Sequence, residues 1–437
     1  MQKHYHLIGI GGIGMSGIAK LLLQANFRVS GSDLYPSKAT EELVRLGAKV
    51  FIGHNGAYLS DVDAVVYSSA IKENNPEIIE AKKQGICLIK RAEALAQLMK
   101  EKKVIAVSGS HGKTTTTSLI SHLLFEAGLK PTVAIGGILR NIDNNVYSGS
   151  GEYFVAEADE SDGSFLYYEP TYSIVTNIDR EHLDYYKVFE NELDTFRQFF
   201  NKTKSNGCLY YCADDSNIKN IISGYKNSSI SYGLREKALV RPQHIEFKEL
   251  TCEFDCIYKD KFIERFYLAL GGLHNISNAL SVIALGLDLG LDKQIIKKAL
   301  SNFKGTRRRL EVKFKNEDYT IIDDYAHHPS ELKATLSAIG NLKRRRLIAI
   351  FQPHRFTRTK LLLEEFATSF YEADIIIITD IYAANEKPIE GVSAEALYEK
   401  IKIIYPRKEV IYLAKEKIRE YVLKSEVRLI FSLNPAI

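Results

Sequence analysis

The sequence has no long hydrophobic run and no strong excess of charge of either sign. No apolar stretch reaches the roughly 18 residues that a membrane-spanning helix needs, and the first residues predict a strand and a glycine turn rather than a leader peptide. The net charge of +4 over 437 residues is too small to indicate nucleic-acid binding, although it suits anionic small substrates. We therefore expect a cytoplasmic protein with neither a membrane nor a nucleic acid as its partner.

Cysteine is scarce, and its spacing does not indicate a disulfide framework. Four of the five cysteines form two C-x3-C pairs, Cys208 with Cys212 and Cys252 with Cys256, and both pairs lie in strand-like runs. Residues four apart in an extended strand are separated by roughly 13 Å, whereas two ligands of one zinc ion lie about 4 Å apart. We expect reduced cysteines within strands, and a zinc site would require a turn in place of either strand.

The length predicts two or three domains, and no internal repeat or low-complexity tract is present. The first hundred residues alternate strand-like runs, from "YHLIGI" to "ICLIKR", with helical patterns near 15–25, 38–46, 76–84 and 92–100. This alternation indicates a parallel, doubly wound sheet. A second α/β unit opens at "VIAVSGS", and a third follows "FKGTRRRLEVKF". The predicted fold is α/β with three domains, 1–100, 101–305 and 306–437: a Rossmann-like N-terminal sheet, a central P-loop-type ATPase domain and a C-terminal Rossmann-like domain.

A first glycine-rich turn follows the first predicted strand. Gly9, Gly11 and Gly14 form the pattern G-x-G-x-x-G, and Asp33 ends the second predicted strand, where it could contact a ribose. Taken alone, this fingerprint favours NAD.

A second glycine-rich turn, "SGSHGKTTTT", predicts a triphosphate-binding loop. Its glycines allow successive N–H groups to point at phosphate oxygens at the start of a helix. Lys113 would reach the β- and γ-phosphates, and Thr114 would offer its hydroxyl to Mg²⁺. Val107 stands where the strict pattern has glycine, so the match is to a shortened pattern. An ordinary strand–helix turn is the alternative.

Acidic residues follow a later strand, in "VAEADESDG". At its C-terminal end, where α/β folds place their ligands, come Glu157, Asp159, Glu160 and Asp162. Carboxylate oxygens suit Mg²⁺, and a solvated acidic loop is the alternative. His182, in "TNIDREHLDYY", follows another strand end and is a candidate ligand for a second metal.

Six motifs appear in a fixed order: "GSHGKTTTT", "EADESD", "NIDREHLDYY", "GLHNISNALSVIA", "DDYAHHP" and "QPHRFTR". In these motifs the chain closely resembles the Mur ligases, from the first glycine loop to about residue 430. The resemblance implies a UDP-sugar-binding first domain, a central domain for ATP and magnesium, and a third domain for the amino acid. The first glycine loop then binds the UDP diphosphate rather than NAD.

The resemblance further implies an ADP-forming reaction of peptidoglycan precursor synthesis. L-alanine would be joined to the lactyl carboxylate of UDP-N-acetylmuramate through an acyl phosphate. The alternatives are a recycling ligase that adds a whole peptide to the same nucleotide sugar, a folate-type glutamate ligase, and a non-enzymatic nucleotide-binding module. No feature of the sequence indicates an oligomeric state.

The site residues that the resemblance implies fall into four groups. ATP is expected to contact Ser110, His111, Gly112, Lys113, Thr114, Thr115, His274, Asn275, Asn278, Arg308 and Asp324. The nucleotide sugar and the amino acid are expected at Gly11, Gly12, Ile13, Gly14, Asp33, His54, Ser69, Arg91, Tyr325, His328, His354 and Arg358. Two Mg²⁺ ions, which Mn²⁺ is expected to replace, would use Thr114, Glu157 and His182. The catalytic residues would be Lys113, His182, Arg355 and His327.

Several of these residues also have an interpretation that involves no ligand. Asn275 and Asn278 could be helix-capping asparagines, and Arg307–Arg309 and Lys343–Arg346 could be solvated surface runs. Arg197 stands near the position where several relatives carry a carbamylated lysine, so we do not expect that modification. Asn385 replaces a frequent glycine, and asparagine suits a turn with positive φ. After "VRLIFSL" relatives continue with a glycine-rich turn and a last helix, whereas this chain has "NPAI", so we expect the final helix to be missing.

Overall fold

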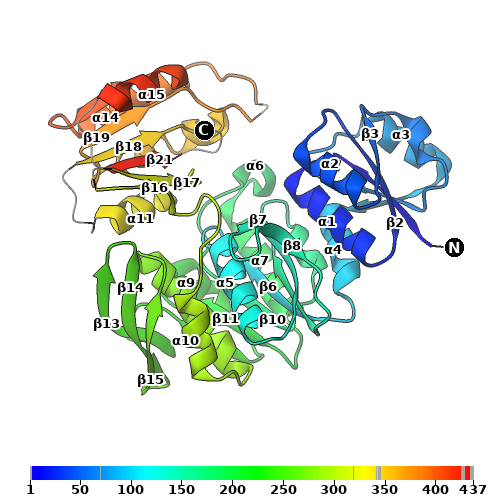
Figure 1. Cartoon of the computed structure of the whole chain (residues 1–437), viewed down its shortest axis with the longest axis horizontal. Coiled ribbons are helices and arrows are strands. Elements are labelled where there is room, and N and C mark those ends of the chain that lie inside the picture. Colours follow the sequence, from blue (N-terminus) through cyan, green and yellow to red (C-terminus); the bar gives the residue numbers. More distant parts are fainter. Residues whose placement is uncertain are drawn as a thin grey trace. The chain divides into compact units, whose positions relative to one another are not determined.

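The computed structural model describes residues 2–68, 70–235, 237–317, 319–340, 342, 346–384, 386–424 and 429–433. The chain divides into two compact units. Figure 1 labels helices and strands of both. The first comprises Met1–Arg241, Tyr258–Asp260 and Asn278–Ala299, and the second comprises Pro242–Ile257, Lys261–Ser277 and Leu300–Ile437. Within the described residues, every helix is too short or too polar to cross a bilayer.

The first unit begins with a five-stranded parallel sheet in the order β3-β2-β1-β4-β5, which is the Rossmann order. Its strands are β1 (His4–Ile8), β2 (Arg28–Asp33), β3 (Lys49–Ile52), β4 (Ala64–Tyr67) and β5 (Cys87–Lys90). Its helices are α1 (Ile13–Gln24), α2 (Lys38–Arg45), the 3₁₀ helix η1 (Gly56–Leu59), α3 (Pro76–Gln84) and α4 (Arg91–Met99). The four predicted α-helices lie within two residues of these bounds.

A second sheet of the first unit carries the second glycine loop. Its strands follow the order β12-β11-β10-β6-β9-β7-β8 and are parallel where their register is described, except for the antiparallel pair β7–β8. They are β6 (Lys103–Ser108), β7 (Thr132–Leu139), β8 (Asn144–Tyr147), β9 (Tyr153–Glu157), β10 (Tyr172–Val175), β11 (Cys208–Cys212) and β12 (Ser229–Tyr232). The helices are α5 (Lys113–Glu126), η2 (Ser164–Tyr167), α6 (Leu183–Tyr186), α7 (Phe189–Lys202) and α8 (Ser216–Ile222).

Aromatic packing fixes the acidic loop that follows β9. Phe165, in η2 directly after this loop, stacks on Phe199 of α7 with ring centroids 4.6 Å apart and meets Phe196 edge-on at 5.3 Å. All three rings are fully buried. The loop is therefore anchored at its C-terminal end by a large apolar contact.

The second unit contains a β-ribbon and a six-stranded sheet. The ribbon is β13 (Val240–Lys248), which begins in the first unit, β14 (Thr251–Tyr258) and β15 (Lys261–Leu268). Helix α9 (Leu273–Asp288) leads back into the first unit, and α10 (Lys293–Ser301) returns to the second. The sheet has the order β16-β17-β21-β18-β19-β20, and only β16 pairs antiparallel. Its strands are β16 (Glu311–Lys315), β17 (Thr320–Asp324), β18 (Leu347–Phe351), β19 (Ile375–Ile378), β20 (Glu409–Tyr412) and β21 (Leu429–Leu433).

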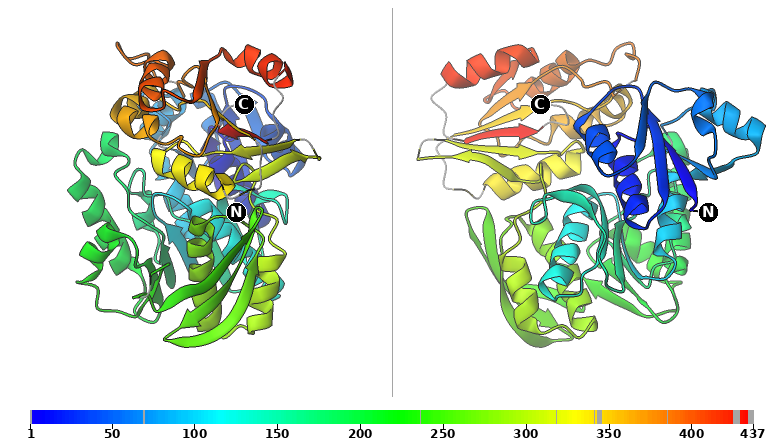
Figure 2. Two further views of the ribbon diagram at one scale, coloured as in Figure 1. Left: turned by 90° about the vertical axis from the view of Figure 1, so that its left-hand side faces the viewer. Right: turned by 45° about the vertical axis from the view of Figure 1, so that its right-hand side comes forward.

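Helices cover both faces of this six-stranded sheet (Figure 2). Successive side chains of a strand point to opposite faces, so Ala349 and Phe351 of β18 join one core and Ile348 and Ile350 join the other. The first core packs on α11 (Pro329–Gly340), α13 (Leu363–Ala367) and α14 (Ala394–Ile404), and the second packs on α15 (Lys415–Lys424). The short α12 (Phe356–Leu361) precedes α13. The predicted α/β fold with three sheets is confirmed, and the three domain ranges remain predictions.

All five cysteines lie in described residues, and none forms a disulfide. Cys208 and Cys212 belong to β11, and Cys252 and Cys256 belong to β14, which confirms that both pairs lie in strands. These four side chains are buried, whereas Cys87 is exposed. Burial raises the pKa of Cys252 and of Cys256 to about 12.

We predict that a thiol reagent at pH 8 modifies one thiol per native chain rapidly, because Cys87 is exposed and the other four thiols are buried and out of reach of the reagent. The Cys87→Ser variant should lose the fast phase, and unfolding should expose the other four thiols. A second fast thiol in the native protein would contradict the buried placement of the two pairs.

Candidate active site

The second glycine loop, residues 109–112, joins the buried strand β6 to helix α5. Gly109 and Gly112 have φ values of +127° and +82°, which side chains rarely adopt. A Cβ atom on Gly109 would lie 2.2 Å from Thr176 Oγ1, so the loop approaches the end of β10 too closely for any other residue. Val107, at the position of the strict pattern's first glycine, is instead a fully buried residue of β6.

Side chains that follow β10 hold the loop in shape. The backbone amide of His111 donates to Asn177 Oδ1 at 2.8 Å, and His111 O accepts from Asn177 Nδ2 and Thr176 Oγ1 at 3.0 and 2.6 Å. The ring Nε2 of His111 lies 3.1 Å from Asp179 Oδ2. These contacts therefore hold the loop in one conformation before a ligand binds. The first backbone N–H groups of α5 point out of the helix at its N-terminus, next to the loop.

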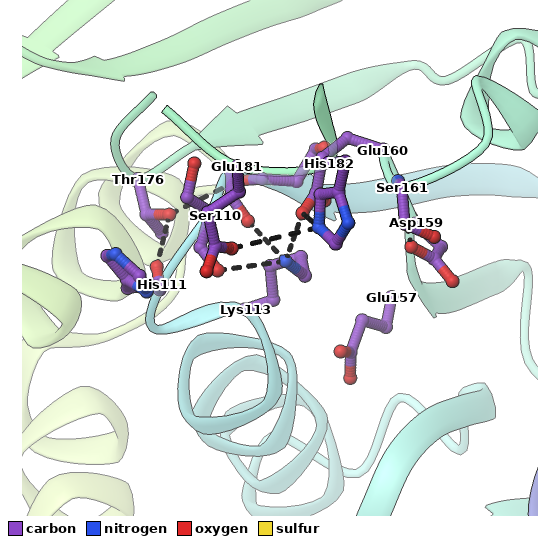
Figure 3. Close-up of polar contacts among 12 residues, drawn as sticks. Ser110, His111, Lys113, Glu157, Asp159, Glu160, Ser161, Thr176, Glu181 and His182 are labelled. Carbon is purple, nitrogen blue, oxygen red and sulfur yellow. Dashed lines mark hydrogen bonds and ion pairs between the residues drawn. The ribbon is translucent and has the colours of Figure 1, made fainter. Parts of the chain in front are cut away.

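The Lys113 ammonium lies inside this loop. Nζ donates to the carbonyl oxygens of Gly109 and Ser110 and, at 2.7 Å, to Glu160 Oε1 (Figure 3). The Glu160 side chain is only 1% exposed. Burial acts to lower the pKa of Lys113, but the carboxylates of Glu160, Glu157 and Asp159 outweigh burial and raise it. Lys113 is therefore a buried cation whose present counter-ion is Glu160.

The hydroxyl of Thr114 and the carboxylate of Glu157 form a pair suited to Mg²⁺. Thr114 Oγ1 lies 3.0 Å from both carboxylate oxygens of Glu157, and the Gly136 amide donates to Glu157 Oε2 at 2.8 Å. Burial raises the pKa of Glu157 despite the nearby Lys113. An octahedral Mg²⁺ with bonds of 2.0–2.1 Å holds neighbouring oxygens about 2.9 Å apart. The Thr114–Glu157 spacing fits such an ion.

His182 lies in a second group of possible metal ligands. Its Nε2 is 3.6 Å from Glu160 Oε1 and 3.7 Å from Glu181 Oε2, and one ligand atom from each of the three residues lies within 4.8 Å of the others. Burial acts to lower the pKa of His182, but Glu160 and Glu181 raise it. The backbone of His182 has φ +55°, a left-handed conformation that is uncommon in residues other than glycine. Such conformations cluster at functional sites.

The first glycine loop is braced by Asp33 at the end of β2. The Gly11 amide donates to Asp33 Oδ2 at 2.8 Å, and a Cβ atom on Gly11 would lie 2.9 Å from the same oxygen. Asn145 Nδ2 donates to Ile13 O at 3.2 Å, and the Ile13 side chain is exposed. Gly12 directly precedes α1. The loop is therefore preformed, with its residues at the end of the sheet where ligands bind.

A cavity of about 300 Å³ connects the two glycine loops within the first unit. Gly14 and Arg91 line it from the N-terminal sheet, and Lys113, Glu157 and Asp159 line it from the second sheet. Arg91 Nη2 lies 3.2 Å from Asp159 Oδ2. A Cβ atom on Gly14 would lie 2.5 Å from Arg91 Nη1, so glycine there makes room for the guanidinium. A molecule in this cavity would contact both loops.

In the second unit, Arg308 and the two aspartates of β17 form one group. Arg308 Nε lies 3.4 Å from Asp323 Oδ2, and its guanidinium lies over the Tyr325 ring at 5.1 Å. Asp324 accepts backbone amides from Leu310 at 2.7 Å and from Ala326 at 2.8 Å. Burial raises the pKa of Asp324 to about 6. Asp324 thus orders the chain around Arg308, while Asp323 faces the guanidinium.

The histidines of "DDYAHHP" and "QPHRFTR" form a second group there. His327 and His354 have ring centroids 5.7 Å apart, and His354 Nδ1 lies 3.0 Å from Arg358 Nη1. Burial and the neighbouring His327 and Arg358 lower the pKa of His354 to about 3. His328 is buried, and Arg355 adopts φ +69°.

The "HNISNA" residues divide between the two units. In the second, burial lowers the pKa of His274 to about 4, and Asn275 Nδ2 donates to Gly271 O at 2.8 Å. In the first, Asn278 lies beside the loop, since a Cβ atom on Gly112 would be 2.8 Å from Asn278 Oδ1. Ser69 and Asn385 lie outside the described residues, as do residues 343–345.

The sequence analysis named Glu160 only among the carboxylates that suit Mg²⁺, and it did not assign Glu181 to the site. Glu160 belongs to the acidic motif "VAEADESDG", and Glu181 directly precedes His182. Both residues therefore lie within motifs that the sequence analysis identified. The contact between Glu160 and Lys113 joins residues that are 47 positions apart, and no local pattern predicts it.

Three family models match consecutive parts of the chain. They are described as "Mur ligase family, catalytic domain" over residues 4–103, "Mur ligase middle domain" over 107–286, and "Mur ligase, glutamate ligase domain" over 308–428. The chain belongs to the Mur ligase family, as its motifs predicted.

Within the Mur ligases, the chain is similar to several curated relatives and solved structures. A UDP-N-acetylmuramate–L-alanine ligase from Syntrophus aciditrophicus is 48% identical over 94% of this chain and 85% of its own length. The protein of the same name from Aquifex aeolicus is 45% identical over 96% and 92%. The crystal structure of UDP-N-acetylmuramate-alanine ligase from Thermotoga maritima has a TM-score of 0.83, with 27% identity, covering 99% of this chain and 95% of that one. A murein peptide ligase from Psychrobacter arcticus has a TM-score of 0.71, with 25% identity and the same coverage.

We predict that Lys113→Ala lowers ATP turnover by at least about a hundredfold. The substitution removes the ammonium group that the loop encloses, and this group is expected to contact the phosphates. The control is Lys103→Ala, at the opposite end of β6, where the side chain is half exposed and pairs with Glu152. Phosphate release measures turnover and circular dichroism measures folding, so together they show whether a variant has lost catalysis or has unfolded. Near-parental turnover by Lys113→Ala would refute the triphosphate-loop assignment.

Proposed function

We propose that the chain is an ATP-dependent ligase that joins L-alanine to the lactyl carboxylate of UDP-N-acetylmuramate, producing ADP and phosphate. The observation that carries this proposal is the cavity with Gly14 and Arg91 on one side and Lys113 and Glu157 on the other. Residues of both glycine loops line this cavity, which supports a nucleotide sugar at the first loop and a triphosphate at the second. The names of the relatives at 45–48% identity support the same activity.

ATP would bind at the second loop by replacing an anion that is already there. The Glu160 carboxylate contacts Lys113 Nζ at 2.7 Å in the cradle where the β- and γ-phosphates are expected. A triphosphate carries more charge and would take over the ammonium, while the first amides of α5 donate to its oxygens. Ser110, His111, Gly112 and Thr115 supply the rest of the loop and the first helical turn.

Two Mg²⁺ ions are proposed at the groups described above. Thr114 and Glu157 would hold one ion, since their spacing fits its coordination, and His182 would assist the second, beside Glu160 and Glu181. Bound Mg²⁺ supplies positive charge that offsets the negative charge of the phosphoryl group during transfer. Imidazole binds Mn²⁺ better than Mg²⁺, so Mn²⁺ should replace Mg²⁺ at the His182 group.

The reaction requires that two anions approach each other. The lactyl carboxylate attacks the γ-phosphorus and displaces ADP, which gives an acyl phosphate, and the alanine amine then displaces phosphate from the carbonyl carbon. Arg91 and Lys113 lower the repulsion between the carboxylate and the triphosphate, because both cations line the cavity. Arg91 is held there by Asp159.

The residues proposed for alanine lie in the second unit. An arginine, Arg355 or Arg358, would pair with the alanine carboxylate. His327 is the better placed of the two facing histidines to accept a proton from the ammonium. Its Nδ1 lies 2.8 Å from Tyr325 O and therefore carries a hydrogen, which makes Nε2 the basic nitrogen of the neutral ring. In His354 the basic Nδ1 already faces Arg358.

A phosphate-release assay tests the proposal. The protein should release phosphate from ATP only when UDP-N-acetylmuramate is present with L-alanine, with glycine and L-serine as competing amino acids. A recycling ligase would instead require a tripeptide, and the higher TM-score of the alanine ligase structure favours the free amino acid. Phosphate release with the tripeptide alone, or tight binding of NAD to the chain, would overturn the assignment.

We predict that His182→Ala lowers turnover by ten- to a thousandfold, within the several kcal/mol that charge stabilisation by a metal supplies, and leaves ATP affinity near the parental value. The parent should work with Mn²⁺ at least as well as with Mg²⁺, and the variant should need more metal. His244→Ala, whose side chain is 74% exposed, is the control. Parental turnover by His182→Ala throughout a metal titration would make the residue structural.

A further inference from the structure

The cavity between the two glycine loops has an apolar part that the chemistry above does not use. Ile18 and Leu21 of α1 and Ala92 and Leu95 of α4 line it, and these two helices pack on each other. All four side chains are buried. A ligand group that enters this part of the cavity loses its contact with water, so an apolar group is favoured there and a charged group is disfavoured.

A buried tyrosine lies beside this apolar part. Tyr168 directly follows η2, which packs on α4, and it lines the same cavity. Tyr168 is only 4% exposed. Among the residues that the structure describes, none forms a hydrogen bond with its hydroxyl. A buried hydroxyl without a partner is costly, so this one is expected to find its partner in a ligand.

The charges that act on the phenol indicate which way it faces. Burial raises the pKa of Tyr168 above its usual value, and Arg91 acts against this shift. Asp159, Asp162 and Glu157 act with it. Arg91, Asp159 and Glu157 all line the cavity, so the phenol oxygen faces the cavity. The hydroxyl keeps its proton and is a neutral hydrogen-bond donor.

Tyr168 therefore lies where the charged and the apolar parts of the cavity meet. Arg91 and Leu95 are four residues apart on α4, so they lie on one face of the helix. Arg91 is held at the charged part by Asp159, at 3.2 Å. A ligand group beside Tyr168 would meet a neutral donor on one side and apolar side chains on the other.

One group of the proposed nucleotide sugar matches these surroundings. The diphosphate and the lactyl carboxylate are anions, and they are expected at the first glycine loop and beside Arg91 and Lys113. The sugar hydroxyls both donate and accept, and they carry no apolar portion. The acetamido group combines a neutral carbonyl oxygen, which accepts a hydrogen bond, with a methyl group that is favoured in an apolar pocket.

We propose that Tyr168 donates a hydrogen bond to the acetamido carbonyl of the nucleotide sugar, while the acetamido methyl packs on Ala92 and Leu95. Tyr168 would then determine specificity for an N-acetylated sugar and take no part in phosphoryl transfer. The inference rests on the proposed function, since it requires UDP-N-acetylmuramate to occupy the cavity.

Calorimetric titration of the full chain with two ligands tests the proposal. One ligand is UDP-N-acetylmuramate, and the other is its N-thioacetyl analogue, in which sulfur replaces the acetamido oxygen. Sulfur is a weak acceptor, so the parent should prefer the oxygen compound by about tenfold. Tyr168→Phe keeps the ring and removes the donor. It should weaken binding of the oxygen compound by about tenfold and bind the two compounds within about threefold of each other.

Tyr167→Phe is the matched control, because this adjacent tyrosine is 41% exposed. It should keep the parental preference. Steady-state kinetics give a second measurement: Tyr168→Phe should raise KM for UDP-N-acetylmuramate and leave kcat near the parental value, because the reacting carboxylate belongs to another group of the sugar. The preference of the parent keeps the test valid if Tyr168→Phe fails to fold.

The outcomes separate this inference from the proposed function. If the parent does not bind UDP-N-acetylmuramate, the proposed function fails. If the parent binds both compounds equally, or if Tyr168→Phe keeps the parental preference, the inference is overturned and the proposed function stands. If Tyr168→Phe weakens both compounds by the same factor, the hydroxyl contacts a different group of the sugar, and the acetamido assignment is refuted.

Discussion

The architecture of the first unit depends on enclosing one positive charge. The Lys113 ammonium sits within a loop closed by Gly109 and Gly112, and its only carboxylate hydrogen bond described by the structure is to Glu160. A buried cation without a counter-ion would cost several kcal/mol, so the loop requires an anion at all times. Glu160 fills that requirement in this state, and a triphosphate would fill it during catalysis.

The surrounding elements make this exchange of anions feasible. Thr176 and Asn177 hold the loop from outside, so the cradle keeps its shape whichever anion is present. Phe165 anchors the acidic loop that carries Glu160, because its ring is stacked under α7. Arg91 ties the N-terminal sheet to the same loop through Asp159. The nucleotide sugar and the triphosphate would therefore meet at a site that is organised before either binds.

Local signals in the sequence were sufficient for the elements and the motifs. Helix α3 begins where the Asn75 side chain accepts the Glu77 amide and Pro76 takes the first position, and it ends at Gly85 with φ +71°. Such start and stop signals can be recognised without tertiary information. The second glycine loop was equally clear from its glycines, lysine and threonine run, and its binding of a triphosphate stays a prediction.

Long-range pairings were not accessible in this way. Strand β21, the last in the sequence, inserts between β17 and β18, and no pattern within its own residues indicates these neighbours. Glu77 was predicted only as part of a helix, whereas the structure buries it against Ser32 and His54, which lie on two other segments. The contact between Lys113 and Glu160 joins two motifs that were each recognised, and its existence follows only from the way that β6 and β9 pair.

The most direct test is a crystal structure of the chain with a non-hydrolysable ATP analogue, Mg²⁺ and UDP-N-acetylmuramate. The account predicts that Lys113 Nζ moves from Glu160 to the β- and γ-phosphate oxygens, that Thr114 and Glu157 share one Mg²⁺, and that the lactyl carboxylate lies in the cavity beside Arg91. A triphosphate bound elsewhere while Lys113 stays on Glu160, or a nucleotide sugar bound away from the cavity, would contradict it.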